Sequence, residues 1–518
     1  MKRPTEPQEK IIILDFGSQY TQLIARRVRE ARVYSEIIDG EATFDTIQAQ
    51  QPTGIILSGG PASVHNTDAP GPDPRIFDMG VPILGICYGL QWVTKQFGGN
   101  VKKSGSREYG PAELRLVGDN PLFAGMPERF RVWMSHGDEV TTVAPGFEVV
   151  GSSESVPNAA LFDPQRRVWG VQFHPEVAHT QYGSRIIRNF ARRVCGCHGR
   201  WTPRAYIDVV TEALRAQVGS DGVILGLSGG VDSTVAAMLL QRAIGDQLTC
   251  VFVDNGVLRH DEANRLLRVF KQHLSLNVKF VDAGDLFLDR LAGVAEPEKK
   301  RKIIGHAFVE VFRQAAQDVR NARFLAQGTT YPDVIESSGI GRHADNIKSH
   351  HNVGGLPKEL GFHQLVEPLR MLFKDEVRAI GKELGLPDEI VWRQPFPGPG
   401  LAVRIVGEIT RERVGILQQA DRILIQEVKA AGWYRRVWQS FVVLLPVQTV
   451  GVMGDERTYE NAVVLRVVHS SDGMTADWAR LPATLLARIA TRITNEVRGV
   501  NRVVYDITSK PPGTIEWE

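Results

Sequence analysis

The segment from Val223 to Thr234 reads VILGLSGGVDST and combines residue types that bind phosphate. Its apolar start, its glycine pair and the helical pattern that follows predict a strand, a turn and a helix. Gly229 and Gly230 allow close backbone approach, and the N-terminus of the helix offers N–H groups to one anion. Asp232 adds a carboxylate, which an anionic ligand tolerates when a cation such as Mg²⁺ lies between them. The sequence therefore predicts a magnesium–polyphosphate site.

The loop lacks the lysine of the GxxxxGK(S/T) pattern, so it is not the common P-loop. A glycine pair alone is typical of any strand-to-helix turn in an α/β domain, but the Ser-Gly-Gly-Val-Asp-Ser order favours a phosphate site. The segment resembles the pyrophosphatase loop of enzymes that split ATP into AMP and pyrophosphate. This resemblance implies ATP contacts at Ser228, Gly229, Gly230, Val231, Asp232, Ser233 and Thr234 and, at the end of the next predicted strand, at Val253 and Asp254.

A second candidate site surrounds Cys87, in the sequence Gly-Ile-Cys-Tyr-Gly between a predicted strand and a predicted helix. This is the layout of a nucleophile elbow, with cysteine in place of serine. The helix dipole favours the thiolate at that position. His174 and Glu176 end a later predicted strand and, being two residues apart on it, are expected to point to one face. The three residues together predict a nucleophile, a proton carrier and an orienting carboxylate.

The Ser-Gly-Gly-Pro loop at residues 58–61 ends another predicted strand, and its N–H groups fit part of an oxyanion hole. A buried cysteine, a His-Pro-Glu turn and a Gly-Gly-Pro turn are each ordinary by themselves, but their joint order favours catalysis. The first block resembles a class I glutamine amidotransferase domain. The resemblance implies that Cys87 is the nucleophile, His174 the general base and then acid, and Glu176 its orienting group. It further implies oxyanion or glutamine contacts at Gly59, Gly60, Tyr88 and Gln91.

Composition limits the class of protein. The length of 518 residues predicts about three domains, and a net charge of +2 gives no global attraction to nucleic acid or anionic membranes. Four cysteines do not make a disulfide framework, and the Cys195-Gly196-Cys197-His198 run lacks a second ligand pair at zinc spacing. With no visible signal peptide and no run of about 18 apolar residues, the expected location is the cytoplasm.

Apolar strands alternating with helical patterns predict an α/β fold with two open, mostly parallel sheets and a small C-terminal α+β domain. The predicted domains are an amidotransferase domain at residues 10–199, an ATP pyrophosphatase domain at 200–393 and a third domain at 394–518. In the third domain we expect a helix near residues 409–430, strands near 441–452 and 461–468, a long helix near 476–497 and a last strand near 502–507.

Three further stretches are unusual for loops or ends. Residues 298–305 are basic and then apolar, which fits a solvated helix start or a mobile lid over phosphates. Residues 347–357 form a polar, glycine-rich stretch with two adjacent histidines, which fits a nucleotide-facing loop better than a zinc site. The segment 508–518 carries Lys510, a Pro-Pro-Gly run and Glu516, which favours ordering by a ligand over fraying.

Together with the first two sites, these stretches resemble the glutamine-hydrolysing GMP synthetase family over nearly the whole chain. The resemblance implies that XMP, ATP, glutamine and water give GMP, AMP, pyrophosphate and glutamate, with Mg²⁺ and no tightly bound organic cofactor. It also implies a homodimer through the third domain, and no nucleic-acid or membrane partner. The implied XMP contacts are Arg301, Asp455, Lys510 and Glu516.

Three alternative functions share part of this sequence pattern. Glutamine-dependent NAD and asparagine-type synthetases share the phosphate loop, but their glutaminase domains are of other kinds. An RNA-modifying protein on the same loop would need a basic face, which the net charge does not support. A catalytically inactive glutamine sensor conflicts with the intact Cys87, His174 and Glu176.

Overall fold

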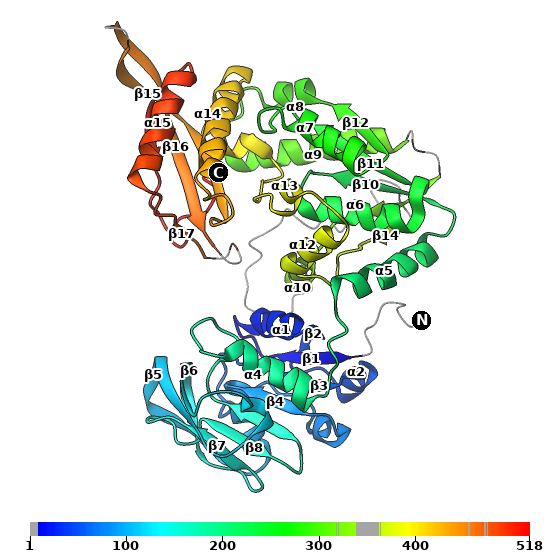
Figure 1. Cartoon of the computed structure of the whole chain (residues 1–518), viewed down its shortest axis with the longest axis vertical. Coiled ribbons are helices and arrows are strands. Elements are labelled where there is room, and N and C mark those ends of the chain that lie inside the picture. The colour runs from blue at the N-terminus through cyan, green and yellow to red at the C-terminus, as the bar shows by residue number, and fades with distance from the viewer. Residues whose placement is uncertain are drawn as a thin grey trace. The chain divides into compact units, whose positions relative to one another are not determined.

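The computed structural model describes residues 9–337, except 318 and 320, and residues 362–518, except 363, 454, 455, 471, 472 and 474. The chain divides into two units, which are described separately (Figure 1). The first contains Met1–Val209 and Thr330–Val353, and the second Val210–Thr329 and Gly354–Glu518. The predicted domain boundaries at residues 199 and 393 stay predictions.

The first unit is built on a nine-stranded sheet in the order β2-β1-β3-β4-β9-β8-β7-β5-β6. The first five strands of this order are parallel, and the remaining pairs are antiparallel. The strands are β1 (Lys10–Asp15), β2 (Tyr34–Asp39), β3 (Gly54–Leu57), β4 (Ile83–Ile86), β5 (Asn100–Leu116), β6 (Arg129–Thr142), β7 (Glu148–Ser152), β8 (Ala160–Asp163) and β9 (Val168–Val171). The α-helices are α1 (Thr21–Glu30), α2 (Phe44–Ala49), α3 (Tyr88–Gln96), α4 (Gly183–Asn189) and α10 (Tyr331–Ser337).

The second unit contains a parallel sheet in the order β12-β11-β10-β13-β14. Its strands are β10 (Gly222–Leu227), β11 (Leu248–Asp254), β12 (Val278–Asp282), β13 (Ala322–Ala326) and β14 (Gln364–Val366). Its helices include α6 (Val231–Ile244), α7 (Glu262–Arg268), α8 (Gly284–Leu291), α9 (Pro297–Gln317), α12 (Lys374–Glu383) and α13 (Asp388–Val391), and α5 (Pro203–Val218) spans the division between the units. Every residue of β10 except Gly226 is buried, as expected of a strand covered on both faces.

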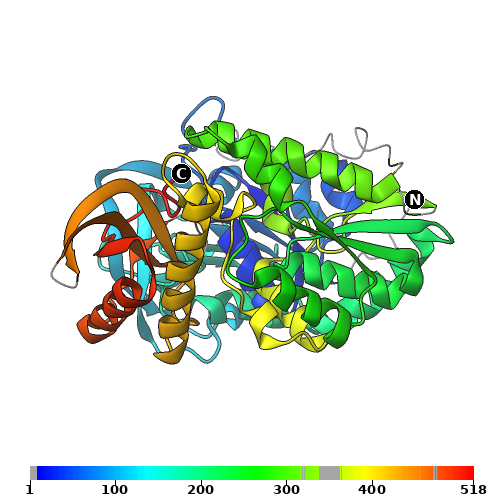
Figure 2. The same ribbon diagram turned by 90° about the horizontal axis from the view of Figure 1, so that it is seen from above.

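The C-terminal part of the second unit is a smaller α+β layer, in which α14 and α15 lie beside the sheet (Figure 2). Its elements are α14 (Arg411–Ala430), β15 (Gln439–Met453), β16 (Glu456–His469), β17 (Asp477–Trp478), α15 (Ala483–Glu496) and β18 (Val500–Tyr505). The strands β15 and β17 pair antiparallel with β16, and β18 pairs parallel with it. One apolar core runs from Ile224 in β10 through α14 to Val500 in β18, so both layers of the unit share a core.

The fold class predicted from the sequence is confirmed, but the start of a predicted C-terminal helix is wrong. The long helix expected near residues 476–497 begins only at Ala483. Asp477 and Trp478 instead pair with His469 and Val468 as β17, because the edge of β16 offers free backbone groups there. Pro482 then starts the helix as its N-cap. Among the described residues, no helix is long and apolar enough to cross a membrane.

Candidate active sites

Cys87 occupies a strained turn between β4 and α3. Its backbone has φ 51° and ψ −104°, which a non-glycine residue rarely adopts. The flanking glycines make this turn possible, since a Cβ on Gly85 would lie 2.7 Å from the backbone of Gly89, and one on Gly89 would lie 2.5 Å from the carbonyl oxygen of Leu57. The elbow predicted from the sequence is therefore present, with the thiol at the head of a helix.

His174 and Glu176 form a buried pair, with 2.7 Å between Nδ1 and Oε1. Their side chains are 5% and 0% exposed. The expected reason for their meeting is wrong, because β9 ends at Val171 and both residues lie in the loop beyond it. That loop is held by the backbone N–H of His174, which donates to the carbonyl oxygen of Trp133 at 3.0 Å. The two side chains thus meet through loop geometry and not through strand alternation.

The electrostatic setting of His174 favours its protonated form. Burial lowers the pKa of the imidazole, but the Glu176 carboxylate and the neighbouring Cys87 thiol outweigh burial, so the pKa of His174 lies well above its usual value. Glu176 Oε2 is buried and has no hydrogen-bond partner among the described residues. An imidazolium held in this way stabilises a thiolate beside it and keeps a proton ready for a leaving group.

The glycine loop after β3 lies against this pair. A Cβ on Gly59 would lie 3.2 Å from Cε1 of His174 and 3.8 Å from Cβ of Cys87, so a larger residue would crowd the imidazole at this point. Gly60 packs on Phe16, since a Cβ there would lie 2.6 Å from the Phe16 carbonyl oxygen. The structure thus brings Gly59, Cys87 and His174 together.

The side chains of the other two predicted glutamine contacts, Tyr88 and Gln91, form hydrogen bonds with backbone groups of the protein. The Tyr88 hydroxyl donates to the carbonyl oxygen of Pro70 at 2.5 Å, and Gln91 Nε2 donates to the carbonyl oxygen of Asp138 at 2.7 Å. Gln91 is buried beside the Ser135–Asp138 stretch of β6, and the carbonyl oxygen of Ser135 lies 3.7 Å from the Cys87 sulfur.

Gln172 is a site residue that the sequence analysis missed. It is fully buried, and its Nε2 lies 3.8 Å from Sγ of Cys87. Its Oε1 has no hydrogen-bond partner among the described residues. Its place two residues before His174 at the end of a predicted strand was the signal that could have found it.

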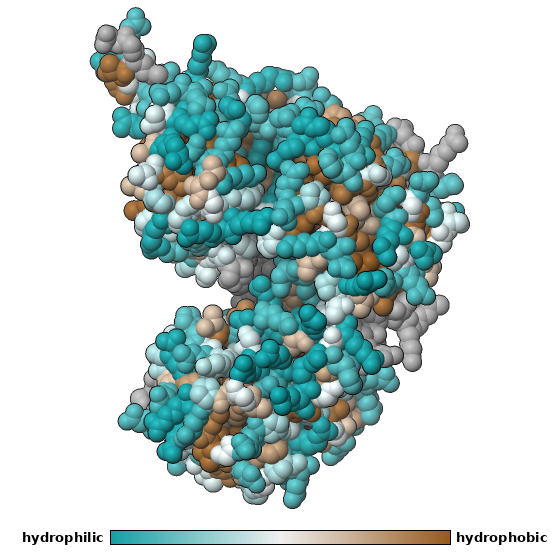
Figure 3. All heavy atoms as spheres, in the orientation of Figure 1, coloured by the Kyte–Doolittle hydropathy of each residue, from teal (hydrophilic) through white to brown (hydrophobic). Residues whose placement is uncertain are grey.

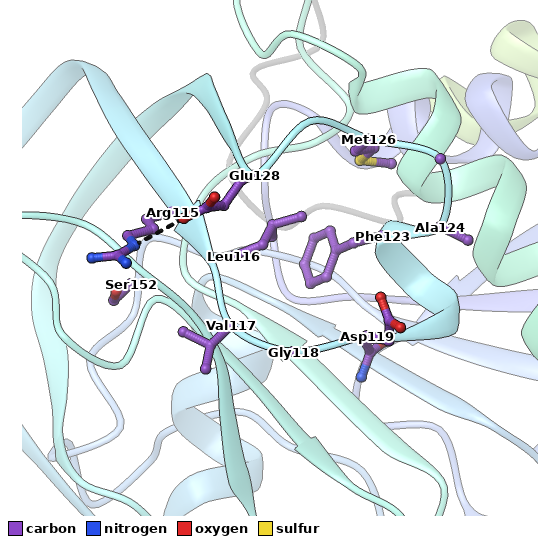
Figure 4. A pocket seen from close by; sticks show the side chains of 12 residues that line it. Arg115, Leu116, Val117, Gly118, Asp119, Phe123, Ala124, Met126, Glu128 and Ser152 are labelled. Carbon is purple, nitrogen blue, oxygen red and sulfur yellow. Dashed lines mark hydrogen bonds and ion pairs between the residues drawn. The ribbon is translucent and has the colours of Figure 1, made fainter.

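A separate surface pocket of about 580 Å³ lies in the antiparallel half of the first unit (Figure 4). Phe123, Met126 and Val117 line it, and Arg115 pairs with Glu128 at 3.3 Å on one side. None of the predicted glutamine-site residues lines this pocket, so it is separate from the predicted glutamine site.

The phosphate loop has the expected strand–turn–helix form. β10 ends at Leu227, Gly229 has φ +73°, and Gly230 is the N-cap of α6. The Ser228 and Ser233 hydroxyls lie 3.0 Å apart. The Thr234 hydroxyl donates to the Gly230 carbonyl oxygen at 2.8 Å. The loop hydroxyls therefore form hydrogen bonds within the loop. The first backbone N–H groups of α6, in contrast, have no acceptor within the helix.

Asp232 lies in the first turn of α6 and pairs with a lysine that was not predicted from the sequence. Lys374 at the start of α12 donates to Oδ2 of Asp232, although 142 residues separate the two. Oδ1 of Asp232 is buried and has no hydrogen-bond partner among the described residues. No group of three or more His, Cys, Asp or Glu side chains able to hold a metal occurs in the described part of the chain. One free carboxylate oxygen fits Mg²⁺ that takes its other ligands from phosphates and water.

Val253 and Asp254 lie at the same edge of the sheet as the loop. The parallel register pairs Leu227, the last residue of β10, with Phe252, so Val253 and Asp254 extend β11 just beyond the end of β10. The Asp254 carboxylate accepts from the Gly256 N–H at 2.9 Å, and burial raises the pKa of this carboxyl group. The position fits a ligand that extends from the loop across the end of β11.

The basic stretch at residues 298–305 forms the first turns of α9, and its cations differ in environment. Lys300 is fully buried, and its Nζ donates to the Ile405 carbonyl oxygen at 2.7 Å and pairs with Glu518 at 2.5 Å. Arg301 donates to a main-chain oxygen of Glu518. The start of α9 is therefore tied to the end of the chain.

The terminal segment is ordered by contacts within the second unit. Lys510 Nζ donates to the Gly473 carbonyl oxygen at 2.8 Å. Glu516 pairs with Arg404 at 2.9 Å. The predicted contact Asp455 and the two histidines of the 347–357 stretch lie outside the described residues.

Three family models match successive parts of the chain. Glutamine amidotransferase class-I matches residues 12–194, NAD synthase matches residues 204–302, and the GMP synthase C terminal domain matches residues 426–517. The class I match around Cys87 agrees with the predicted type of glutaminase domain.

Curated relatives match the chain from end to end. A protein of Maridesulfovibrio salexigens is 55% identical over 511 residues, covering 98% of this chain and 99% of its own. A protein of Caldanaerobacter subterraneus subsp. tengcongensis is 56% identical over 512 residues, covering 99% of both chains. One of Heliobacterium modesticaldum is 56% identical over 514 residues, covering 99% of this chain and 100% of its own. All three carry the name "GMP synthase (glutamine-hydrolyzing)".

Proposed function

This chain belongs to the glutamine-hydrolysing GMP synthase family, and from that premise we propose that it makes GMP by supplying ammonia from glutamine to ATP-activated XMP. The net reaction converts XMP, ATP, glutamine and water to GMP, AMP, pyrophosphate and glutamate. The observation that carries the proposal is the presence in one chain of a buried Cys87–His174–Glu176 constellation and a glycine phosphate loop. A glutaminase does not need a phosphate loop, and an ATP-splitting enzyme does not need a cysteine site. An enzyme that aminates an ATP-activated substrate with nitrogen from glutamine needs both.

In the first reaction, the Cys87 thiolate attacks the carboxamide carbon of glutamine. The oxyanion that develops is stabilised by backbone N–H groups of Gly59 and Gly60. His174 gives its proton to the departing nitrogen, which leaves as ammonia, and a thioester remains on Cys87. Water then attacks the thioester with His174 as base, which releases glutamate and restores the thiol. Glu176 keeps Nδ1 of His174 protonated, so that Nε2 handles the moving proton.

In the second reaction, the loop at residues 228–234 holds the phosphates of ATP and the end of β11 at Val253 and Asp254 holds its adenosine. An oxygen of the xanthine base attacks the α-phosphorus, pyrophosphate leaves, and ammonia then displaces AMP. Lys374, which pairs with Asp232 in this structure, would supply a cation for the phosphates. Mg²⁺ bound to Asp232 would neutralise charge on the phosphates.

We assign the XMP contacts to Arg301, Asp455, Lys510 and Glu516. Arg301 and Lys510 supply cations suited to a 5′-phosphate, and Glu516 supplies an acceptor for N–H groups of the purine. Two of these contacts lie in the terminal segment, which is consistent with the ordering of that segment by internal bonds.

A homodimer through the C-terminal layer is also part of the proposal. The β15–β16 hairpin exposes apolar side chains, with Val452 at 76%, Tyr459 at 57% and Val447 at 51%. Apolar surface also appears near the tip of this hairpin in Figure 3. Several exposed apolar side chains on one hairpin favour a partner surface, and a second copy is the partner proposed.

We further propose a cytoplasmic location, with no nucleic-acid or membrane partner. All four cysteines are free thiols, as expected in a reducing compartment.

The deciding experiment incubates the protein with XMP, ATP, Mg²⁺ and glutamine and measures GMP, AMP and glutamate. Equal amounts of the three products are expected. Formation of ADP in place of AMP would contradict the pyrophosphatase chemistry. Omission of XMP is the control, because GMP must then be absent.

A further inference from the structure

The buried Arg404 forms two hydrogen bonds with Glu516, the residue that we assign to purine recognition. Arg404 donates from Nε to Oε2 of Glu516 at 3.0 Å and from Nη2 to Oε1 at 2.9 Å. The Arg404 side chain is fully buried, and that of Glu516 is 19% exposed. Two parallel bonds fix both the position and the rotation of a carboxylate, which a single donor does not do.

The guanidinium is itself held in place by aromatic rings. Its carbon lies 4.1 Å from the ring centre of Phe441 and 5.1 Å from that of Phe396. Nη1 is buried and has no hydrogen-bond partner among the described residues. Among the described residues, Glu516 is the one carboxylate that pairs with this buried guanidinium, so loss of Glu516 would leave a buried charge uncompensated.

Gln439 adds a third donor to the same carboxylate, from Nε2 to Oε1 at 2.7 Å. An ionised carboxylate offers about four acceptor positions. Both positions of Oε1 and one of Oε2 are taken, so one position on Oε2 is left. Glu516 is thus prepared to accept a single further N–H group, in a direction set by Arg404.

The backbone of Arg404 is anchored to the edge of the parallel sheet. It ends a short 3-10 turn from Gly400 to Arg404. Leu401 N donates to the Val257 carbonyl oxygen at 2.8 Å, three residues beyond the end of β11. A Cβ on Gly400 would lie 2.4 Å from that same oxygen, so the turn sits tightly on the loop that follows β11.

We propose that Arg404 is a positioning residue for base recognition: it orients Glu516 so that its one remaining acceptor position takes one N–H group of the purine of XMP. The inference rests on the proposed function, which assigns Glu516 to XMP. Arg404 acts through Glu516 and does not touch the reacting atoms. Because its turn rests on the loop after β11, it also sets the distance between the base and the nucleotide edge of the sheet.

The test is a double-mutant cycle with ammonium as the nitrogen source, which makes the readout independent of Cys87. The variants are Arg404→Met, Glu516→Gln and their combination, with Arg404→Lys as the conservative change. Each single change is expected to raise the KM for XMP by about 10- to 100-fold, the usual effect of losing a hydrogen bond to a charged group. The KM for ATP is expected to change less than about 2-fold. The double variant should be no worse than the worse single variant, because both remove the same interaction.

Arg492→Met is the matched control. Arg492 also forms ion pairs with glutamates of this layer, Glu427 and Glu496, but these lie outside the terminal segment. It should leave the KM for XMP unchanged. Arg404→Lys keeps the charge and is expected to fall between wild type and Arg404→Met, and it carries the test if Arg404→Met does not fold. Thermal unfolding of each variant shows which of them are folded.

The outcomes separate the inference from the proposed function. Fully additive effects of Arg404→Met and Glu516→Gln would overturn the inference, because they would show that Arg404 acts by another route. The same conclusion follows if the KM for ATP rises as much as that for XMP. A wild-type protein that makes no GMP would overturn the proposed function itself, and an unchanged KM in Glu516→Gln alone would remove the assignment of Glu516.

Discussion

The cysteine site of the first unit and the nucleotide site of the second unit differ in how their functional groups are paired. In the first, the groups that do chemistry are bonded to one another, as in the 2.7 Å contact between His174 and Glu176. In the second, they are bonded to other parts of the chain: Asp232 to Lys374, and Glu516 to Arg404.

This difference follows from the ligands. Glutamine hydrolysis uses the protein's own thiol and imidazole, so these can be arranged before substrate arrives. Nucleotide activation depends mainly on positioning the substrate and balancing its charges with protein groups of opposite sign. In the absence of substrate, these protein groups must be neutralised by other parts of the chain. We therefore expect the cysteine site to be assembled before glutamine binds. The nucleotide site would still need its ligands, the phosphates beside Asp232 and Lys374 and a base at the acceptor position that Glu516 keeps open.

The largest effect is expected from Cys87→Ala. Glutamine-dependent GMP formation should fall by at least about 1,000-fold, because the nucleophile is removed. Formation of GMP from added ammonium salts should be unchanged, since the second unit does not use the thiol. Loss of both activities would show that Cys87 supports the fold and not only hydrolysis.

The second-largest effect is expected at the nucleotide site of the second unit. Asp232→Asn should lower AMP release by roughly 100-fold with either nitrogen source, since the metal ligand at the phosphates is weakened. Hydrolysis of glutamine to glutamate, measured by itself, should persist in this variant. Asp246→Asn, an exposed carboxylate after the same helix, is the control and should have no effect. Unchanged AMP release in Asp232→Asn would contradict the magnesium assignment.

A smaller effect is expected from Gly229→Ala, which probes the shape of the loop. At φ +73° the new Cβ would lie 2.4 Å from Leu266 and 2.4 Å from Arg393, so loop and neighbours must shift. We expect a rise of about 10-fold in the KM for ATP and a loss of about 1–3 kcal/mol in the free energy of unfolding. Gly415→Ala, in a helix with open space at the Cβ, should instead be neutral or slightly stabilising. Equal behaviour of the two variants in chemical denaturation would argue against a strained loop.

The smallest effect is a shift in pH dependence. Glu176 raises the pKa of His174, so Glu176→Gln should lower it. In the wild type, His174 keeps its proton to a higher pH than free histidine, and in the variant it loses the proton at a lower pH. Titration of the imidazole by nuclear magnetic resonance measures this directly. A titration that does not move would show that Glu176 does not set the charge of His174.

Much of the fold could be predicted from the sequence, because strands that are buried on both faces read as apolar runs and the helices between them have a clear period. The exception at residues 477–478 is instructive. Asp477 and Trp478 fit a helical pattern locally, but pairing with β16 satisfies their backbone groups. Tertiary pairing of this kind leaves no trace in local periodicity.

The chain's own sequence determined the two motifs whose geometry is local: the strained elbow at Cys87 and the glycine loop before α6. Adjacent residues build each of them, so spacing and residue type are enough. Only the tertiary structure decided which distant side chains complete them. Lys374 reaches Asp232 from 142 residues away and Arg404 reaches Glu516 from 112 residues away. A single sequence does not encode such contacts as a pattern, because they depend on how packed layers bring separate loops to one edge of a sheet.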